Sequence, residues 1–76
     1  ERVFVVGYVR NTGAITFEEG MTVFEAIAAA GGISEKGSNS RIEIIRIENG
    51  QRKSIDAEQT DLLKPGDQVN VRPRRL

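Results

Sequence analysis

The sequence predicts an α+β fold in which one helix packs on one face of a sheet of about five strands. Two observations support this prediction. One segment shows helical periodicity between clear start and stop signals, and five short segments are rich in β-branched and aromatic residues. The chain has 76 residues, of which 38% are hydrophobic and 29% charged, as expected for a globular domain. We therefore expect residues 1–76 to form a single domain. Because the chain lacks an initial Met, we also expect it to be a piece excised from a longer protein.

The N-terminal residues predict a β-hairpin. The run Val3–Val9 has the residue types that fit a pleated sheet, and residues 14–17 return as a second short strand. Asn11-Thr12-Gly13 between them supplies turn residues. Gly7 lies inside the first run, which indicates that another backbone segment or a helix approaches closely there.

A helix is predicted to begin after Thr22. Thr22 is a favourable N-cap, and Glu25 stands three residues later, which completes a capping box. Gly31-Gly32 ends the helix, with the first glycine expected in the left-handed conformation. The apolar residues that share the sheet-facing stripe are Val23, Ala26, Ile27 and Ala30.

A second hairpin is predicted over residues 41–56. Residues 34–40 are polar and are expected to form a loop, and 41–48 form an isoleucine-rich strand. Asn49-Gly50 is the strongest short hairpin signal, after which residues 51–56 return.

The length of this hairpin loop determines which isoleucines face the helix. A two-residue loop places Ile44 opposite Ile55, with Ile42 and Ile44 facing inward, and this is the register that we predict. A three-residue loop with a bulge would instead place Ile45 opposite Ile55 and turn the strand over.

The C-terminal third predicts a short helical turn, a tight turn and a last strand. Asp56 is expected to cap a helical turn through Gln59, with Leu62 and Leu63 filling the core below it. Lys64–Asp67 forms a tight turn, since proline and glycine occupy its second and third positions. The final strand stops at Pro73, and the basic residues at 72–75 are expected to form a solvated linker, with a binding arm as the alternative.

The pattern also predicts the core and the position of the aromatic residues. The three Phe residues are expected around the core, which leaves Tyr8 as the only exposed aromatic ring. The residues predicted to be buried are Val5, Val9, Val23, Ile27, Ile44, Leu63, Val69 and Val71, surrounded by Phe4, Phe17 and Phe24.

The composition argues against several classes of function. The chain has no His and no Cys, so the commonest catalytic bases and nucleophiles are missing, and we expect no enzyme activity and no cofactor. Asp56, Glu58 and Asp61 do not have the spacing of an EF-hand calcium loop, and capping explains them better. The formal net charge is zero, which disfavours nucleic acid as a partner. No apolar run approaches the length of about 20 residues that a membrane span requires, so we expect no direct membrane insertion of this domain.

Several motifs together resemble the soluble-ligand-binding β-grasp (SLBB) family. Each is weak alone, but they follow one another in order over nearly the whole chain. Thr12 is a small departure, since the family often places proline there. The motifs are Val5-x-Gly7-x-Val9 with Asn11-Thr12-Gly13, Thr22-Val23-x-Glu25-Ala26-Ile27 leading to Ala30-Gly31-Gly32, Ile44-Ile45-Arg46, and Leu63-Lys64-Pro65-Gly66-Asp67-x-Val69-x-Val71.

The resemblance implies a ubiquitin-like roll with a mixed sheet, in which the first and last strands lie side by side and parallel. The motifs look most like those of bacterial outer-membrane polysaccharide export proteins, which carry such domains in the periplasm, stacked into a ring around the polymer. The expected partners are therefore other domains and copies of the parent protein, and polysaccharide. The expected function is a non-catalytic assembly and ligand-binding module. The alternatives are a lectin-like glycan-binding domain and the β-grasp domain of a competence-type DNA-uptake receptor.

Two small groups of residues are the candidate ligand contacts. Tyr8 offers an aromatic platform, with Arg10 and Asn11 nearby as hydrogen-bonding groups. In the predicted hairpin register Arg46 lies directly opposite Lys53, an unfavourable like-charge pair. Either an anionic ligand offsets this repulsion, or both side chains splay into water, which is the interpretation that we favour.

Overall fold

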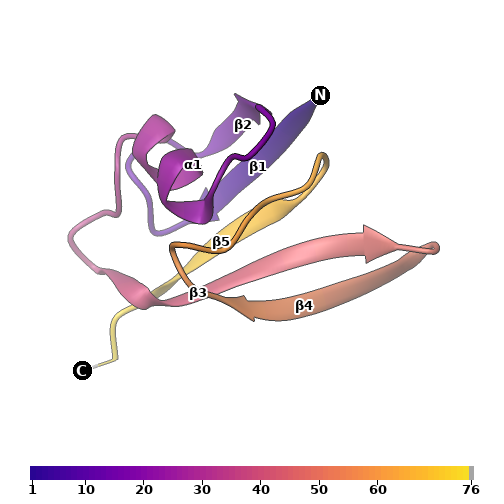
Figure 1. The fold of residues 1–76 in the computed structure, drawn as a ribbon. Coiled ribbons are helices and arrows are strands. Elements are labelled where there is room, and N and C mark those ends of the chain that lie inside the picture. Colours follow the sequence, from indigo (N-terminus) through magenta and orange to yellow (C-terminus); the bar gives the residue numbers. More distant parts are fainter. Residues whose placement is uncertain (76) are drawn as a thin grey trace.

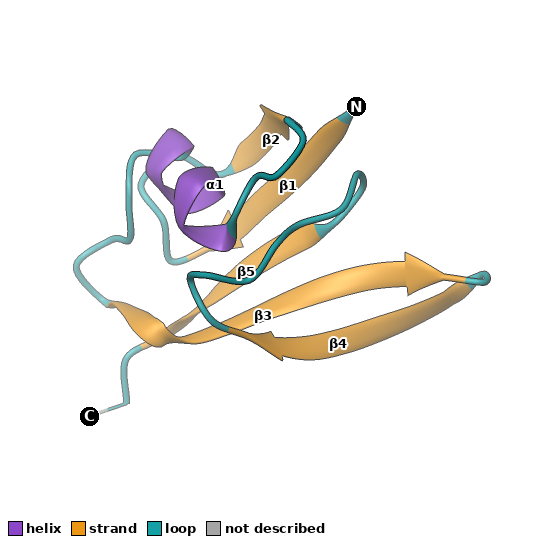
Figure 2. Ribbon diagram, viewed as in Figure 1, coloured by secondary structure: helices purple, strands orange, loops and turns teal. Residues whose placement is uncertain are grey.

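The computed structural model describes residues 1–75, which form one helix and one five-stranded sheet (Figures 1 and 2). The strand order in the sheet is β2-β1-β5-β3-β4. The elements are β1 (Arg2–Gly7), β2 (Gly13–Thr16), α1 (Val23–Ala29), β3 (Gly37–Glu48), β4 (Gln51–Ala57) and β5 (Gln68–Pro73). The predicted α+β class is confirmed. Within residues 1–75, no helix has the length and apolar character needed to cross a membrane.

The first and last strands pair in parallel at the centre of the sheet, as the family resemblance implied. Val5 of β1 lies beside Val69 of β5, whereas all other strand pairs are antiparallel. Gly7 allows this close pairing, since a Cβ atom there would lie 2.3 Å from the carbonyl oxygen of Val71. Its φ of 89° is also a conformation that other residues avoid.

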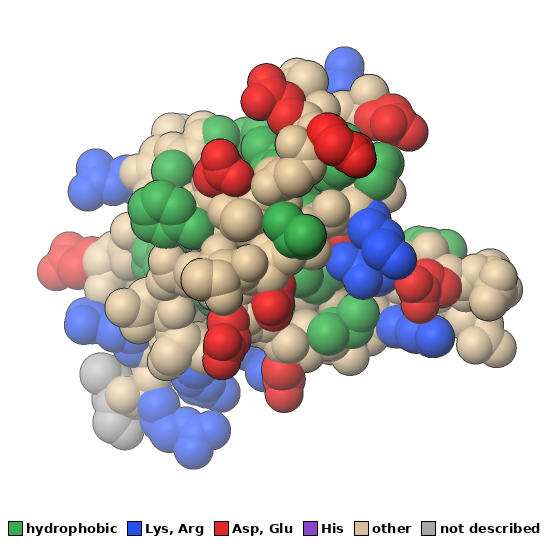
Figure 3. Space-filling model, viewed as in Figure 1, with side chains coloured by type: hydrophobic (Ala, Val, Ile, Leu, Met, Phe, Trp, Pro, Cys, Tyr) green, Lys and Arg blue, Asp and Glu red, His purple; other side chains and the backbone are tan. Residues whose placement is uncertain are grey.

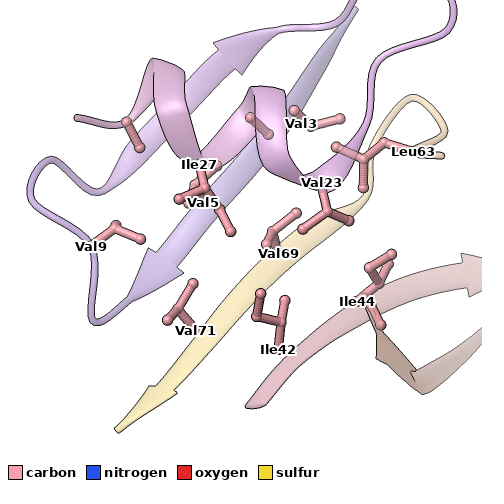
Figure 4. Close-up of a cluster of buried hydrophobic side chains, with 13 residues drawn as sticks. Val3, Val5, Val9, Val23, Ile27, Ile42, Ile44, Leu63, Val69 and Val71 are labelled. Atoms are coloured by element: carbon pink, nitrogen blue, oxygen red, sulfur yellow. The ribbon is translucent and has the colours of Figure 1, made fainter. Parts of the chain in front are cut away.

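Helix α1 begins and ends as predicted. The Thr22 side chain accepts a hydrogen bond from the backbone N–H of Glu25, and the Glu25 carboxylate accepts one from the backbone N–H of Thr22. Gly31 takes a φ of 86° just past the helix, the left-handed conformation expected there. The buried stripe of the helix lies on β1 and β5 (Figure 4).

The β3–β4 hairpin has the predicted two-residue loop, with Ile44 opposite Ile55. Asn49 and Gly50 both have positive φ, 52° and 76°, as a type I′ turn requires. The hairpin extends beyond the part of the sheet that α1 covers (Figure 1).

The start of β3 differs from the prediction. Residues 34–40 were expected to be a loop, but β3 begins at Gly37, which pairs with Pro73 of β5. A bulge follows before Ile42, and the Ser38 hydroxyl accepts hydrogen bonds from the backbone N–H groups of Ser40 and Arg41 there. The polar residues that suggested a loop therefore supply hydrogen-bond partners for backbone groups that the bulge leaves unpaired at the start of β3.

The core confirms the predicted set of buried residues. It is made almost entirely of small and β-branched side chains, which bring α1 close to the sheet. The buried hydrophobic residues are Val3, Val5, Val9, Val23, Ala26, Ile27, Ala30, Ile42, Ile44, Ala57, Leu63, Val69 and Val71 (Figure 4).

The aromatic residues do not surround the core as predicted. Phe4 and Phe24 are 43% and 57% exposed, and only Phe17 packs against the core. Phe4 alternates with the buried valines of β1, so it lies on the sheet face away from α1. Phe24 follows Val23 on the helix and is therefore turned about 100° away from the buried stripe.

The predicted helical turn at 56–59 is also wrong. Strand β4 continues to Ala57, and a turn follows in which the carbonyls of Gln59 and Asp61 accept hydrogen bonds from the first N–H groups of α1. Beyond the turn Leu63 is buried, but Leu62 is 63% exposed, because adjacent residues of extended chain point to opposite sides.

Candidate functional site

The two predicted groups of ligand contacts lie at opposite ends of β5 and do not form one site. The Tyr8 backbone N–H donates to the carbonyl of Val71, near the end of β5. Arg46 contacts Asp67, which directly precedes β5. Asp67 and Val71 are four positions apart along the extended chain, a distance of about 13 Å.

Tyr8 borders a surface hollow of about 330 Å³. The side chain is 42% exposed, as expected for an aromatic platform. Its neighbours come from distant parts of the sequence, since the hollow is lined by Tyr8, Glu35, Lys36, Pro73 and Arg74. The sequence indicated the basic residues 72–75 only as an alternative binding arm and did not group any of these four residues with Tyr8, because nothing in the local pattern of β1 indicates which segments lie beside it.

Arg10 and Asn11 are exposed but do not line this hollow. Their backbone N–H groups donate to the carbonyls of Gly32 and Ala30, at the C-terminal end of α1. Their side chains lie close to Gly31, where an added Cβ would be 2.8 Å from the Asn11 amide nitrogen. Of the predicted trio, the structure therefore places only Tyr8 at the hollow.

Arg46 lies opposite Lys53 in the register, as predicted, but neither proposed explanation of that pair describes Arg46. Its guanidinium donates two hydrogen bonds to Asp67, from Nε (3.0 Å) and from Nη2 (2.8 Å). This hydrogen bonding raises the pKa of Arg46 above its usual value. Lys53 turns instead to Glu48, 3.3 Å away. Each of the two cations thus contacts a carboxylate within the domain, so neither an external anion nor solvent alone relieves the repulsion.

The ion pair between Arg46 and Asp67 connects β3 to the turn at Lys64–Asp67, and we call this pair the clamp. Only 1% of Asp67 is exposed, and its carboxylate also accepts a hydrogen bond from the backbone N–H of Lys64 at 2.8 Å. Gly66 has positive φ, and the Asp67 N–H donates to the carbonyl of Lys64, as expected for the predicted tight turn. The clamp fixes this turn to the projecting β3–β4 hairpin.

A second polar network lies on the sheet face away from α1. The Glu43 carboxylate accepts hydrogen bonds from Ser54, from Asn70 (2.8 Å) and from Arg72 (2.8 Å). These three donors, in that order of importance, lower the pKa of Glu43 from 4.5 to about 2. The network connects β4, β3 and β5, and the Glu43 carboxylate is fully used in these contacts between strands.

The basic end of the chain is more ordered than the predicted solvated linker. Arg41 donates to the carbonyl of Pro73, and the backbone N–H of Arg74 donates to the carbonyl of Lys36 at 2.8 Å. Figure 3 shows several Lys and Arg side chains at this end of the molecule, at the lower left, and others elsewhere on the same face. A larger hollow of about 470 Å³ lies here, lined by Ser40, Arg41, Ile42, Asp56, Ala57, Glu58, Arg72 and Arg75.

The described residues offer no arrangement for metal binding. Within residues 1–75, no three His, Cys, Asp or Glu side chains are grouped so that they could hold an ion. In the same range, every buried side-chain nitrogen and oxygen of the residues that are not exposed has a hydrogen-bond partner. The polar side chains of the interior therefore serve the fold, and ligand contacts must be sought on the surface.

Comparison with known proteins identifies the family. The model of the SLBB domain family matches residues 2–56. Two Escherichia coli proteins described as polysialic acid transport protein KpsD are 42% and 40% identical to the chain, each over 72 residues, or 95% of it. The chain spans only 12% of the length of either relative. The chain belongs to the SLBB domain family.

Proposed function

We propose that this domain is a non-catalytic assembly and ligand-binding module of a polysaccharide export protein that acts in the periplasm. The observation that carries the proposal is the 42% identity, over 95% of the chain, to a polysialic acid transport protein. In this role the domain contacts other domains and copies of its parent protein, and the polymer passes beside it.

The distribution of charged groups supports a structural role over catalysis. Asp67 is buried but held by Arg46, and Glu43 is held by three donors. A general acid or base must be free to exchange a proton with substrate near the working pH. Glu43, with a pKa of about 2, is a poor candidate for that task.

A domain exchange tests the proposal. The stretch of the E. coli relative that matches this chain is replaced by residues 1–76, and surface polysialic acid is measured in cells that lack the native transport protein. We expect export to be restored, since the two stretches are 42% identical over 72 residues and therefore share the fold.

The control replaces the same stretch by an unrelated ubiquitin-like domain of similar size, which should not restore export. The proposal is wrong if the exchanged protein accumulates to the normal level in the envelope and still exports nothing.

A lectin-like role is the second candidate, because more aromatic surface is exposed than the sequence predicted. Phe4, Tyr8 and Phe24 are each more than 40% exposed, at 43%, 42% and 57%. Aromatic rings of this kind can stack on the apolar faces of sugars. They lie on three different elements or loops, however. Phe24 borders a hollow lined by no Lys or Arg, whereas the Tyr8 hollow contains Lys36 and Arg74.

A further inference from the structure

The hollow beside Tyr8 is held in shape by backbone hydrogen bonds. The N–H of Ser34 donates to the carbonyl of Tyr8, and the N–H of Gly37 closes a turn on the carbonyl of Ser34, both at 2.9 Å. The N–H of Arg74 then donates to the carbonyl of Lys36. Three segments that are far apart in sequence are therefore fixed around the hollow, so a ligand need not order them on binding.

Gly37 brings the turn against Tyr8. An added Cβ at this position would lie 2.5 Å from the Tyr8 carbonyl oxygen and 3.1 Å from the Tyr8 Cβ. Only glycine permits this approach. The close contact brings Glu35 and Lys36 to the hollow that Tyr8 also lines.

The lining of the hollow combines apolar rings with cations. Tyr8 and Pro73 contribute ring surfaces, and Lys36 and Arg74 contribute two positive charges against the one negative charge of Glu35. Within the described range, none of the salt bridges involves Lys36 or Arg74. These two cations are therefore available to a ligand, unlike Arg46 and Arg72.

The larger neighbouring hollow is a weaker candidate for an anion. Its cations face two carboxylates, Asp56 and Glu58, and one of the cations, Arg72, is already paired with Glu43 at 2.8 Å. It contains no aromatic ring. An anionic ligand with an apolar face should accordingly prefer the side of the basic end that carries Tyr8.

We propose that the Tyr8 hollow binds a carboxylate-bearing sugar unit of an acidic polysaccharide. The apolar face of the sugar ring lies on Tyr8 and Pro73, and the carboxylate lies between Lys36 and Arg74. This inference rests on the proposed function and deepens it, because it assigns the residues of this domain that would contact an acidic polymer. Single units bind weakly, and repeated units on a polymer meet repeated copies of the domain.

The direct test is an NMR titration of the domain with a sialic acid tetramer and with the same tetramer after its carboxyl groups have been reduced to alcohols. We expect the acidic form to bind at least about fivefold more tightly, with shifts centred on Tyr8, Lys36 and Arg74. The difference should shrink as salt rises from about 0.05 M to 0.5 M. Equal affinity for both forms would refute the proposal.

Charge variants locate the site. The double variant Lys36→Gln/Arg74→Gln should weaken binding at least about fivefold. The matched control Arg2→Gln/Arg52→Gln removes the same charge from exposed positions of β1 and β4 that do not line the hollow, and it should change binding less than about twofold. Glu35→Gln removes the one acid of the hollow and should strengthen binding. Equal losses in both double variants would show that the tetramer responds only to overall charge.

Two further arms separate this proposal from its alternatives. An acidic peptide of matched charge, or a single-stranded oligonucleotide, that competes as well as the tetramer would show an unselective polyanion surface and overturn the sugar assignment.

The Lys36→Gln/Arg74→Gln change is also placed in the domain-exchanged transport protein. If export is restored by the unaltered domain while the tetramer does not bind, the proposed function stands and the assigned site is wrong.

Discussion

Removing Arg46 should destabilise the domain strongly, because it leaves a buried carboxylate without its main partner. In Arg46→Met the apolar stem is kept, but Asp67 retains only the N–H of Lys64 as a hydrogen-bond donor. Breaking one side of a buried ion pair costs about 3–5 kcal/mol. Arg46 keeps 16% side-chain exposure, so water can partly replace it, and we expect the low end, about 3 kcal/mol.

This loss is large relative to the total stability. A chain of 76 residues is expected to have a free energy of unfolding of about 4–11 kcal/mol. A loss of about 3 kcal/mol corresponds to a decrease of about 12–24 °C in the melting temperature of a domain this small. The change should therefore be visible both in thermal melts and in urea titrations.

A double-mutant cycle separates the pair from its surroundings. Asp67→Asn keeps an acceptor for the Lys64 N–H and should cost about 1–2 kcal/mol. In the double variant with Arg46→Met no buried charge remains, so its cost should be about 2 kcal/mol less than the sum of the two single costs. Urea unfolding followed by circular dichroism measures all four proteins. Arg52→Met, on the exposed outer part of β4, is the control and should change stability by less than about 0.5 kcal/mol. A coupling energy near zero would refute the clamp.

Four other outcomes follow from the structure. Ile27→Ala should lower the free energy of unfolding by about 2–4 kcal/mol, since Ile27 is only 4% exposed in the core, and a melting temperature within two degrees of the parent would contradict this. Gly7→Ala should be more destabilising than Gly50→Ala. Both glycines have positive φ, but only at Gly7 does an added Cβ meet a backbone atom within 3 Å, the carbonyl oxygen of Val71, so equal losses in melting temperature would argue against the steric reason. Because the pKa of Glu43 is lowered from 4.5 to about 2, its stabilising contribution is present above pH 4.5 and is lost as the pH falls toward 2. Urea titrations at several pH values should therefore show a smaller acid-induced loss in Glu43→Gln, and identical pH profiles would exclude this role. Neutral oligosaccharides should bind the isolated domain no more tightly than about 1 mM, and saturable NMR shifts with a dissociation constant below about 100 μM would instead favour the lectin-like role.

The aromatic residues illustrate how far residue type alone can mislead. Phe4 and Phe24 were expected in the core because they are large and apolar, yet β1 alternation and helical rotation place them outward. The same periodicities correctly identified Val5 and Ile27 as buried. Position within the period was therefore a better guide than hydrophobicity in this small core.

The sequence by itself determined the features that depend on neighbouring residues. The capping box at Thr22, the glycine that ends α1 and the two-residue hairpin at Asn49 are local chemistry, so short motifs were enough to place them. The hairpin loop in turn fixed the register of β3 and β4, because one slipped residue would have exposed Ile44. The motifs also indicated the family.

Tertiary structure alone decided which distant groups meet. Arg46 and Asp67 are 21 residues apart, and the Tyr8 hollow joins residues from both ends of the chain and from the loop before β3. The reason is that β5 inserts between β1 and β3, which brings the C-terminal strand beside both. No local periodicity encodes that insertion. The contacts of Arg46 and the neighbours of Tyr8 therefore became visible only when the sheet was assembled.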